Sequence, residues 1–280
     1  MPDISDPCAA LVRSADRDRF LATLFAPADR REHLFALYAF NIEIARVRDV
    51  VREPLPGEIR LQWWREVIDG ARAGEAEAHP IAQRLLATIA ANNLPREAFQ
   101  GVIEARVFDL YNDPMPSLSY LEGYCGETSS ALLRLASIIL AGGKDPGASD
   151  AAGHGGVALG ITSVLRAMAF QRQRGQCYLP ADVLARHGLS AEEVLAKASP
   201  DALREVIKDL CTLIRSHRDR ASTELMSDGA LLLPAFLPLV LIEGDLRRLE
   251  ETADPYAPFS PVPGWRRQLT LWRAARRGAI

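Results

Sequence analysis

The chain has 280 residues, of which 48% are hydrophobic and 25% charged, and its formal net charge at pH 7 is -3. This composition is typical of a globular protein with a substantial core, and the small negative charge argues against nucleic acid as a partner. The four cysteines are Cys8, Cys125, Cys177 and Cys211. They lie far apart without a CxxC pair, which argues against a disulfide framework and a zinc site.

The first twenty residues contain no apolar stretch of the kind found in secretory signals, and they mix acidic residues with arginine. The sequence therefore predicts neither a signal peptide nor a clear transit peptide. Together with the scattered cysteines, this favours a reducing, cytoplasmic setting, with the inner membrane surface as a further candidate location.

Apolar residues recur at helical spacing along most of the chain, and no useful alternating strand pattern occurs. The sequence predicts an all-α protein forming a single domain over residues 1–280, with its core at about 16–250. The predicted helices cover Leu34–Val51, Gly57–Arg72, Ile81–Asn92, Arg96–Tyr111, Leu118–Leu140, Ala148–Gln171, Asp201–Met226, Leu231–Glu251 and Gly264–Arg277.

The most apolar run is Leu231–Ile242, LLLPAFLPLVLI. It is shorter than the ~20 residues that span a bilayer, and Pro234 and Pro238 interrupt it. The pattern favours a buried, kinked helix over an element that lies on a membrane surface.

Two separated stretches carry a family signature. Phe35–Val51 reads FALYAFNIEIARVRDVV, and Gly160–Pro180 reads GITSVLRAMAFQRQRGQCYLP. The first resembles the LYAFCRxxDDxxD signature of the squalene/phytoene synthase family, and the second resembles its LRDxxxD signature followed by RG and YLP. Val107–Leu110 and Tyr124–Ser130 resemble two lesser elements in the same order. The resemblance covers about Asp16 to Glu250, and it implies an isoprenoid-synthase-like helical bundle around a central cavity.

Three of the four acidic positions of these signatures hold other residues. Active members are expected to face two DxxxD pairs toward each other, each pair on one helix face, to hold Mg²⁺ and the substrate diphosphate. Arg46 adds a positive charge beside the first pair. The sequence therefore predicts no metal site, no catalytic residue and no cofactor, and Mg²⁺ would be needed only if a transferase activity survives. The four acidic positions of the two signatures hold Ala45, Asp49, Ala167 and Gln171 in this sequence.

A closer resemblance is to the branch of this family that contains complex I assembly factor 6 of mitochondria and its bacterial relatives. In that branch the first signature looks like AFNxExAxVxDxV, followed by RxQxW, and the second reads HxGxxxGIxxxLRA without either Asp. The chain matches these patterns at residues 39–51, 60–64 and 154–167. The resemblance implies a role in assembling respiratory complex I, with a complex I subunit or assembly intermediate as the partner.

Six residues are candidates for lining a pocket or binding a ligand: Glu43, Arg46, Asp49, Asp109, Arg166 and Tyr178. The first three recur at three-residue spacing on a helix expected to be central, although a solvated ion-pair stripe has the same spacing. Arg166 lies in an apolar helix, where an unpaired charge is costly. We therefore expect it to face the cavity and to pair with Asp49 or Asp109. His154 is expected to be a turn or cap residue before a helix.

The C-terminal segment Gly264–Arg277 combines five arginines with Trp265, Leu269 and Trp272. This pattern indicates a basic amphipathic helix, which could contact acidic lipid headgroups or an acidic partner. A packed terminal helix with a solvated basic face is the favoured interpretation.

The leading hypothesis is a non-catalytic protein of this fold that acts in assembly of complex I. One alternative is an active Mg²⁺-dependent prenyltransferase that condenses prenyl diphosphates, with a metal site rebuilt from the remaining acids. A third is a protein that binds an isoprenoid, quinone or other lipid without converting it. Peripheral membrane contact is compatible with each of them.

Overall fold

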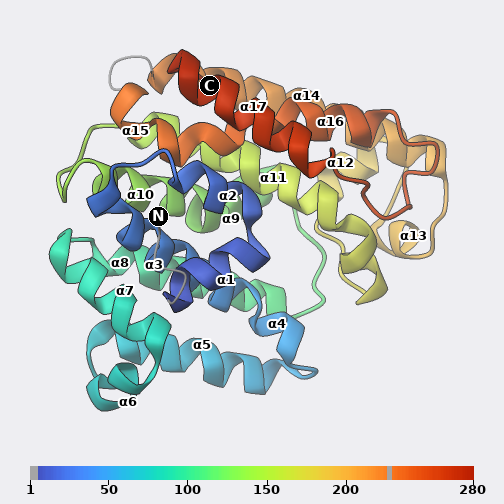
Figure 1. The fold of residues 1–280 in the computed structure, drawn as a ribbon. Coiled ribbons are helices and arrows are strands. Elements are labelled where there is room, and N and C mark those ends of the chain that lie inside the picture. Colours follow the sequence, from blue (N-terminus) through green and yellow to red (C-terminus); the bar gives the residue numbers. More distant parts are fainter. Residues whose placement is uncertain (1–5, 226–228) are drawn as a thin grey trace.

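The computed structural model describes residues 6–225 and 229–280, and every regular element in those ranges is helical (Figure 1). The prediction of an all-α fold is confirmed. The first half contains α1 (Pro7–Ala15), α2 (Arg17–Thr23), α3 (Ala28–Ala45), α4 (Val47–Val50), α5 (Pro54–Asp69), α6 (Ala73–Ala78), α7 (Pro80–Ala91), α8 (Arg96–Ala105) and the 3₁₀ segment η1 (Arg106–Leu110).

The second half of the chain continues the helical arrangement, with one π-helical turn and one further 3₁₀ segment. Its elements are α9 (Leu118–Cys125), the π turn η2 (Gly126–Ser130), α10 (Ala131–Leu140), α11 (Ser149–Gln173), α12 (Ala181–Arg186), α13 (Ala191–Leu195), α14 (Pro200–Glu224), α15 (Gly229–Phe236), η4 (Leu237–Leu241), α16 (Ile242–Glu250) and α17 (Gly264–Arg277). The predicted helix end at Met226 lies outside the described residues.

The long helix α11 runs through the middle of the bundle, where it packs against α14, α10, α16 and η2 (Figure 1). Two glycines allow the close approach on one side. A Cβ atom at Gly156 would lie 2.2 Å from the Ser130 hydroxyl oxygen, and one at Gly160 would lie 2.5 Å from the Cys125 sulfur. Such distances are far below van der Waals contact, so any side chain there would push α9 and η2 away from α11.

The sequence predicted one continuous helix over the first signature, but the structure contains a break there. Helix α3 ends at Ala45, Arg46 interrupts it, and α4 continues only to Val50. Val51 then takes an extended backbone three residues before Pro54, which opens α5. The interruption turns Arg48 and Asp49 to one side of the chain and Val47 and Val50 to the other.

The predicted kink in the apolar C-terminal run is confirmed. Helix α15 contains Pro234, and Pro238 lies in the first turn of η4, which separates α15 from α16. The stretch Gly229–Glu250 is long and apolar enough to cross a membrane by length and composition, yet 67% of its most apolar window is buried inside the protein. This burial is what a core element of the bundle shows.

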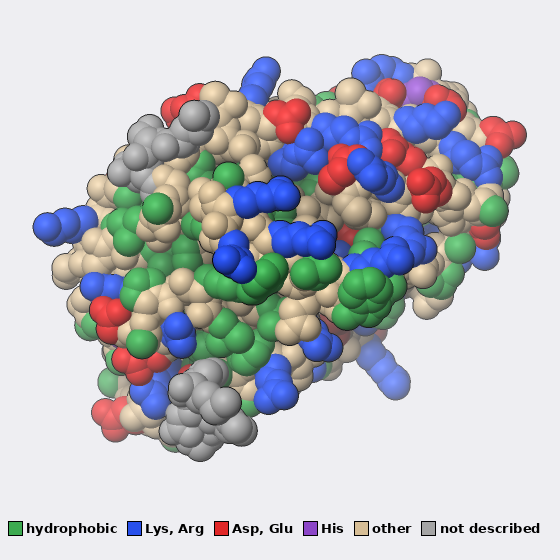
Figure 2. Space-filling view, turned by 45° about the horizontal axis from the view of Figure 1, so that its top comes forward, with side chains coloured by type: hydrophobic (Ala, Val, Ile, Leu, Met, Phe, Trp, Pro, Cys, Tyr) green, Lys and Arg blue, Asp and Glu red, His purple; other side chains and the backbone are tan. Residues whose placement is uncertain are grey.

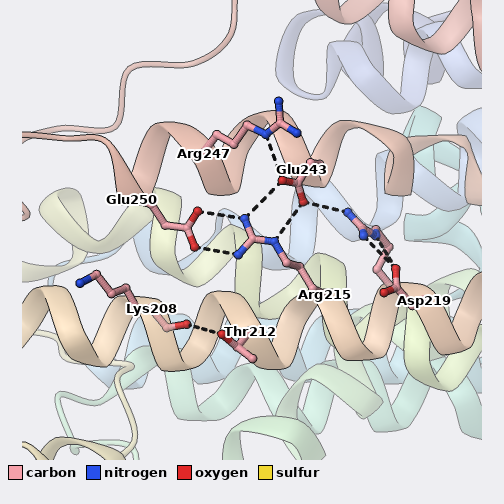
Figure 3. A network of polar contacts seen from close by, with 8 residues as sticks. Lys208, Thr212, Arg215, Asp219, Glu243, Arg247 and Glu250 are labelled. Carbon is pink, nitrogen blue, oxygen red and sulfur yellow. Dashed lines mark hydrogen bonds and ion pairs between the residues drawn. The ribbon is translucent and has the colours of Figure 1, made fainter.

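A network of arginines and glutamates joins α14 to α16 (Figure 3). Arg215 donates from Nη1 and Nη2 to the two carboxylate oxygens of Glu250, at 2.7 and 2.9 Å, and from Nε to Glu243 at 3.1 Å. Arg218 and Arg247 also donate to Glu243. Burial alone would raise the pKa of Glu243, but these guanidinium groups outweigh it and lower that pKa to about 2.

The terminal helix α17 has the predicted boundaries and is packed against the bundle. Its Arg267 is buried and forms ion pairs of 2.5 Å with Asp18 in α2 and with Asp245 in α16. Trp265 and Trp272 remain exposed on the outer side of the same helix. Figure 2, in which this side is turned forward, shows Lys and Arg side chains beside hydrophobic ones across this face.

Candidate functional site

A cavity of about 310 Å³ lies between α3, α4, η1, α9, η2 and α11. All four acidic positions of the two signatures line it, so the helix faces are those that the sequence spacing predicts. Of these four side chains, only that of Asp49 is a carboxylate. The four positions are Ala45, Asp49, Ala167 and Gln171.

Asp49 is occupied by an ion pair. Its Oδ1 lies 2.5 Å from Nη1 of Arg174, which belongs to the turn that follows α11. The Arg174 guanidinium also stacks on Phe170, with its central carbon 3.9 Å from the ring centroid. Both residues line the cavity, and their opposite charges neutralise each other.

Asp109 accepts three hydrogen bonds from side chains inside the cavity wall. The hydroxyl groups of Tyr178 and Tyr124 donate to its Oδ1 at 2.6 and 2.8 Å, and Arg106 donates to its Oδ2 at 3.0 Å. Burial, followed by the neighbouring Asp109 charge, raises the pKa of Tyr178 well above its usual range. Burial disfavours the charge on Arg106, but Tyr124 and Asp109 outweigh that effect and raise its pKa. Asp109 is therefore an anchor of a buried polar cluster.

The balance of charge in the cavity is positive. Four arginines line it against two carboxylates, and both carboxylates are already paired with guanidinium groups. Within residues 6–225 and 229–280, no three His, Cys, Asp or Glu side chains gather so that they could hold a metal ion. Mg²⁺ needs several oxygen ligands in octahedral geometry, and this donor set does not fit it. The arginines are Arg19, Arg48, Arg106 and Arg174.

Three of the six predicted site residues lie together in this cavity: Asp49, Asp109 and Tyr178. Glu43 and Arg46 line a separate hollow on the outer side of α3 and α4. The reason is helical periodicity, because Asn41, Ala45 and Arg48 form the stripe that faces the cavity.

The prediction that Arg166 faces the cavity and pairs with Asp49 or Asp109 is wrong. Its Nη1 lies 3.3 Å from Asp245 in α16, and its guanidinium lies over the ring of Phe259. The α11 stripe that faces the cavity contains Gly160, Ser163, Val164 and Ala167, so residue 166 points toward α16 instead.

The expectation for His154 is also wrong, because it lies inside α11 rather than before it. Its Nδ1 is 2.9 Å from Nδ1 of His217, whose Nε2 is 3.1 Å from Glu122. These contacts tie α11 to α14 and α9.

Three residues that line the cavity were not among the candidates predicted from the sequence: Arg106, Tyr124 and Arg174. Arg106 could have been found from its spacing, because it precedes Asp109 by three residues. Arg174 belongs to the RG turn of the second signature, but its pairing with Asp49 joins residues 125 positions apart. No local pattern carries that information.

The sequence of this chain is similar to those of several known proteins. The squalene/phytoene synthase family model matches residues 12–273. Assembly factor 6 of NADH dehydrogenase (ubiquinone) complex I from Bos taurus is 33% identical over 244 residues, which is 87% of this chain and 73% of that protein. Presqualene diphosphate synthase from Zymomonas mobilis is 29% identical over 222 residues, or 76% of this chain and 72% of that enzyme.

Solved structures agree on the fold. A dehydrosqualene synthase in complex with ligand superposes with a TM-score of 0.80 at 14% identity, covering 96% of this chain and 94% of that one. A squalene synthase from Alicyclobacillus acidocaldarius gives a TM-score of 0.69 at 22% identity, covering 97% and 92%. With the family model matching almost the whole chain and all four signature positions facing one cavity, this protein belongs to the squalene/phytoene synthase family.

Proposed function

We propose that this protein is a non-catalytic member of its family and assists the assembly of respiratory complex I. The relatives that are a third identical to it carry the name of a complex I assembly factor, in Bos taurus and in Homo sapiens alike. The proposed partner is a complex I subunit or an assembly intermediate, and the proposed place of action is the surface of the membrane that holds complex I.

The charge of the central cavity carries this proposal. Ionisation of an allylic diphosphate needs cations that neutralise the leaving group, and the family supplies them as Mg²⁺ held by carboxylates. Here Ala45 and Ala167 carry no ligand atom, Gln171 offers a neutral amide in place of a carboxylate, and Asp49 is already paired with Arg174. The cavity keeps its shape while it lacks the ligands for the reaction.

A condensing prenyltransferase is the second candidate, and the presqualene diphosphate synthases among the relatives favour it. These enzymes are 29% and 28% identical to the chain, which is less than the 33% and 32% of the assembly factors from Bos taurus and Homo sapiens. In a third candidate, the cavity holds an isoprenoid or another lipid without converting it. Bound prenyl lipid in the purified protein, without turnover, would identify this third function.

Deletion of the gene tests the proposed function. We expect assembled complex I and its NADH:quinone oxidoreductase activity to fall, while squalene, phytoene and hopanoid levels stay unchanged. The purified protein, incubated with farnesyl or geranylgeranyl diphosphate and Mg²⁺, should release no diphosphate. Normal complex I together with depleted C30 or C40 isoprenoids would instead identify the chain as a prenyltransferase.

A further inference from the structure

Helix α5 carries large apolar side chains on its outer face. Leu55 and Ile59 are 66% and 62% exposed, and Val50, at the end of α4, is 59% exposed. Trp63 continues the stripe one turn beyond Ile59, because residues 55, 59 and 63 share a helix face. The inner face of α5 buries Leu61, Trp64 and Ile68 in the core. Leu55 and Ile59 are exposed and additional to this packing, whereas Trp63 is partly buried against the core. We call Val50, Leu55, Ile59 and Trp63 the α5 ridge.

Two hollows flank the ridge and meet at Trp63. One, of about 630 Å³, is bordered by Leu55, Ile59 and Trp63, and the other, of about 380 Å³, by Val50, Trp63 and Trp64. The Trp63 indole is fixed between them. Its Nε1 donates to Glu75 at 2.7 Å, and its ring packs on His79 at a centroid distance of 5.2 Å. The surface is therefore preformed, with an apolar crest and space for large side chains on both sides.

The charges around the two hollows differ. In the larger hollow, Arg65 pairs with Glu104, and Arg72 pairs with Glu66 at 2.6 Å. In the smaller hollow, Arg46 and Arg60 are both exposed and form no ion pair with any residue that the structure describes. Glu43 also lines this hollow, so this end of the ridge offers two guanidinium groups against one carboxylate, and the excess positive charge attracts acidic side chains.

This combination identifies the kind of partner. An amphipathic helix places apolar residues at i, i+3 or i+4 and i+7 into a hydrophobic groove. The two hollows beside the ridge can receive such apolar side chains. Arg46 and Arg60 favour a helix with acidic side chains at one end. An anionic lipid surface fits poorly, because Glu58, Glu66 and Glu104 border the larger hollow. Helix α5 also lies on the opposite side of the molecule from the basic helix α17 (Figure 1).

We propose that the α5 ridge is the docking site for an amphipathic helix of a partner protein, whose acidic side chains meet Arg46 and Arg60. The identity of the partner as a complex I subunit or assembly intermediate rests on the proposed function. The docking site itself is separate from the central cavity, because the α4 residues that line the two spaces lie on opposite sides of that helix.

Site-specific photo-crosslinking tests the proposal in cells that assemble complex I. A benzophenone amino acid is placed at Ile59 in the full chain and, as a matched control, at Leu231, an apolar residue of α15 that is 47% exposed. We expect the Ile59 probe to crosslink to one complex I subunit or assembly intermediate, at a peptide that forms an amphipathic helix with Asp or Glu at one end. The Leu231 probe should not crosslink to that protein.

Substitution of the ridge supplies the second measurement. The double variant Val50→Asp, Leu55→Asp, made in the chain that carries the Ile59 probe, should lower that crosslink to below about a tenth of wild type, as expected when central apolar anchors are lost. Without the probe, the same double variant should lower the amount of assembled complex I to a similar extent. Its thermal unfolding midpoint should stay unchanged, since both side chains are exposed. Leu231→Asp should leave crosslinking and assembly at wild-type levels.

Some outcomes would overturn the docking site. Crosslinks only to a second copy of this chain, or none specific to Ile59, would do so, as would a double variant that supports full complex I assembly in a strain where deletion abolishes it. If deletion leaves complex I intact, the proposed function fails by itself. The docking site then stands only if the crosslinked protein forms a stoichiometric complex with the wild-type chain and not with the double variant.

Discussion

Arg174 and Asp49 form an ion pair at the wall of the central cavity, with Nη1 and Oδ1 2.5 Å apart. Asp49 is the single carboxylate left at the four positions where the family carries its paired acids. A guanidinium group thus stands where a dication would need to approach. The pair explains how the cavity keeps one of its acids while losing the capacity to hold a metal with it.

We predict that Mg²⁺ does not bind in the cavity at millimolar concentration. The one remaining signature carboxylate is paired with Arg174, Asp109 is paired with Arg106, and Arg48 lines the same space and repels cations. Isothermal titration of the purified protein with MgCl₂ should give no saturable heat, for both the wild type and Asp49→Ala. A tight site that Asp49→Ala abolishes would contradict this.

Restoring the missing acids should not improve function. In a deletion strain, the triple variant Ala45→Asp, Ala167→Asp, Gln171→Asp should rescue complex I assembly no better than wild type, because the proposed role needs the fold rather than the reaction. The measurement is the amount of assembled complex I on native gels. Better rescue than wild type would show that the reaction matters to the role.

Asp109→Ala should strongly destabilise the protein. It removes the acceptor for Tyr124 and Tyr178 and leaves the partly buried Arg106 without its carboxylate. Breaking a buried pair of this kind costs about 3–5 kcal/mol. Urea unfolding measures the loss, and Asp113→Ala, at an exposed position, is the matched control that should change stability by less than about 0.5 kcal/mol. Equal stability of the two variants would show that the Asp109 cluster does not hold the fold together.

The ion pairs of Glu243 should make stability fall in acid. Its pKa is about 2 in the folded protein against an ordinary value of 4.5, so its contribution is complete above pH 4.5 and is lost as the pH falls toward 2. Chemical unfolding of wild type and Glu243→Gln should therefore differ above pH 4.5, and the difference should shrink between pH 4.5 and 2. The exposed Glu251, changed to Gln, should show no such convergence.

Arg267→Met tests the packing of the terminal helix. Arg267 pairs with Asp18 and with Asp245, and Asp245 is 1% exposed and also faces Arg166. The variant leaves Asp245 with a weaker partner, so we expect a loss of about 2–3 kcal/mol and faster proteolysis near α17. Arg273→Met, on the same helix and exposed, is the control. An unchanged unfolding midpoint for Arg267→Met would contradict the role of this ion-pair chain.

Local spacing predicted much of the fold and part of the site. The boundaries of α17, the proline kink before α16 and the cavity-facing positions of α3, α4 and α11 all follow from periodicity and turn residues near each position in the chain. The same spacing, followed more closely, would also have directed Arg46 and Arg166 away from the cavity, because each lies about a third of a turn from a residue that faces it.

The sequence by itself determined the helices, their inner faces and the loss of the paired acids, because these depend on residues within a few turns of one another. Only the tertiary structure decided which charges meet: Asp49 with Arg174, Arg166 with Asp245, and Asp18 with Arg267. Each of these pairs joins segments far apart in the chain, and its geometry depends on how the helices rotate and pack against each other. Packing of that kind is a property of the whole core, so no local pattern of residues specifies it.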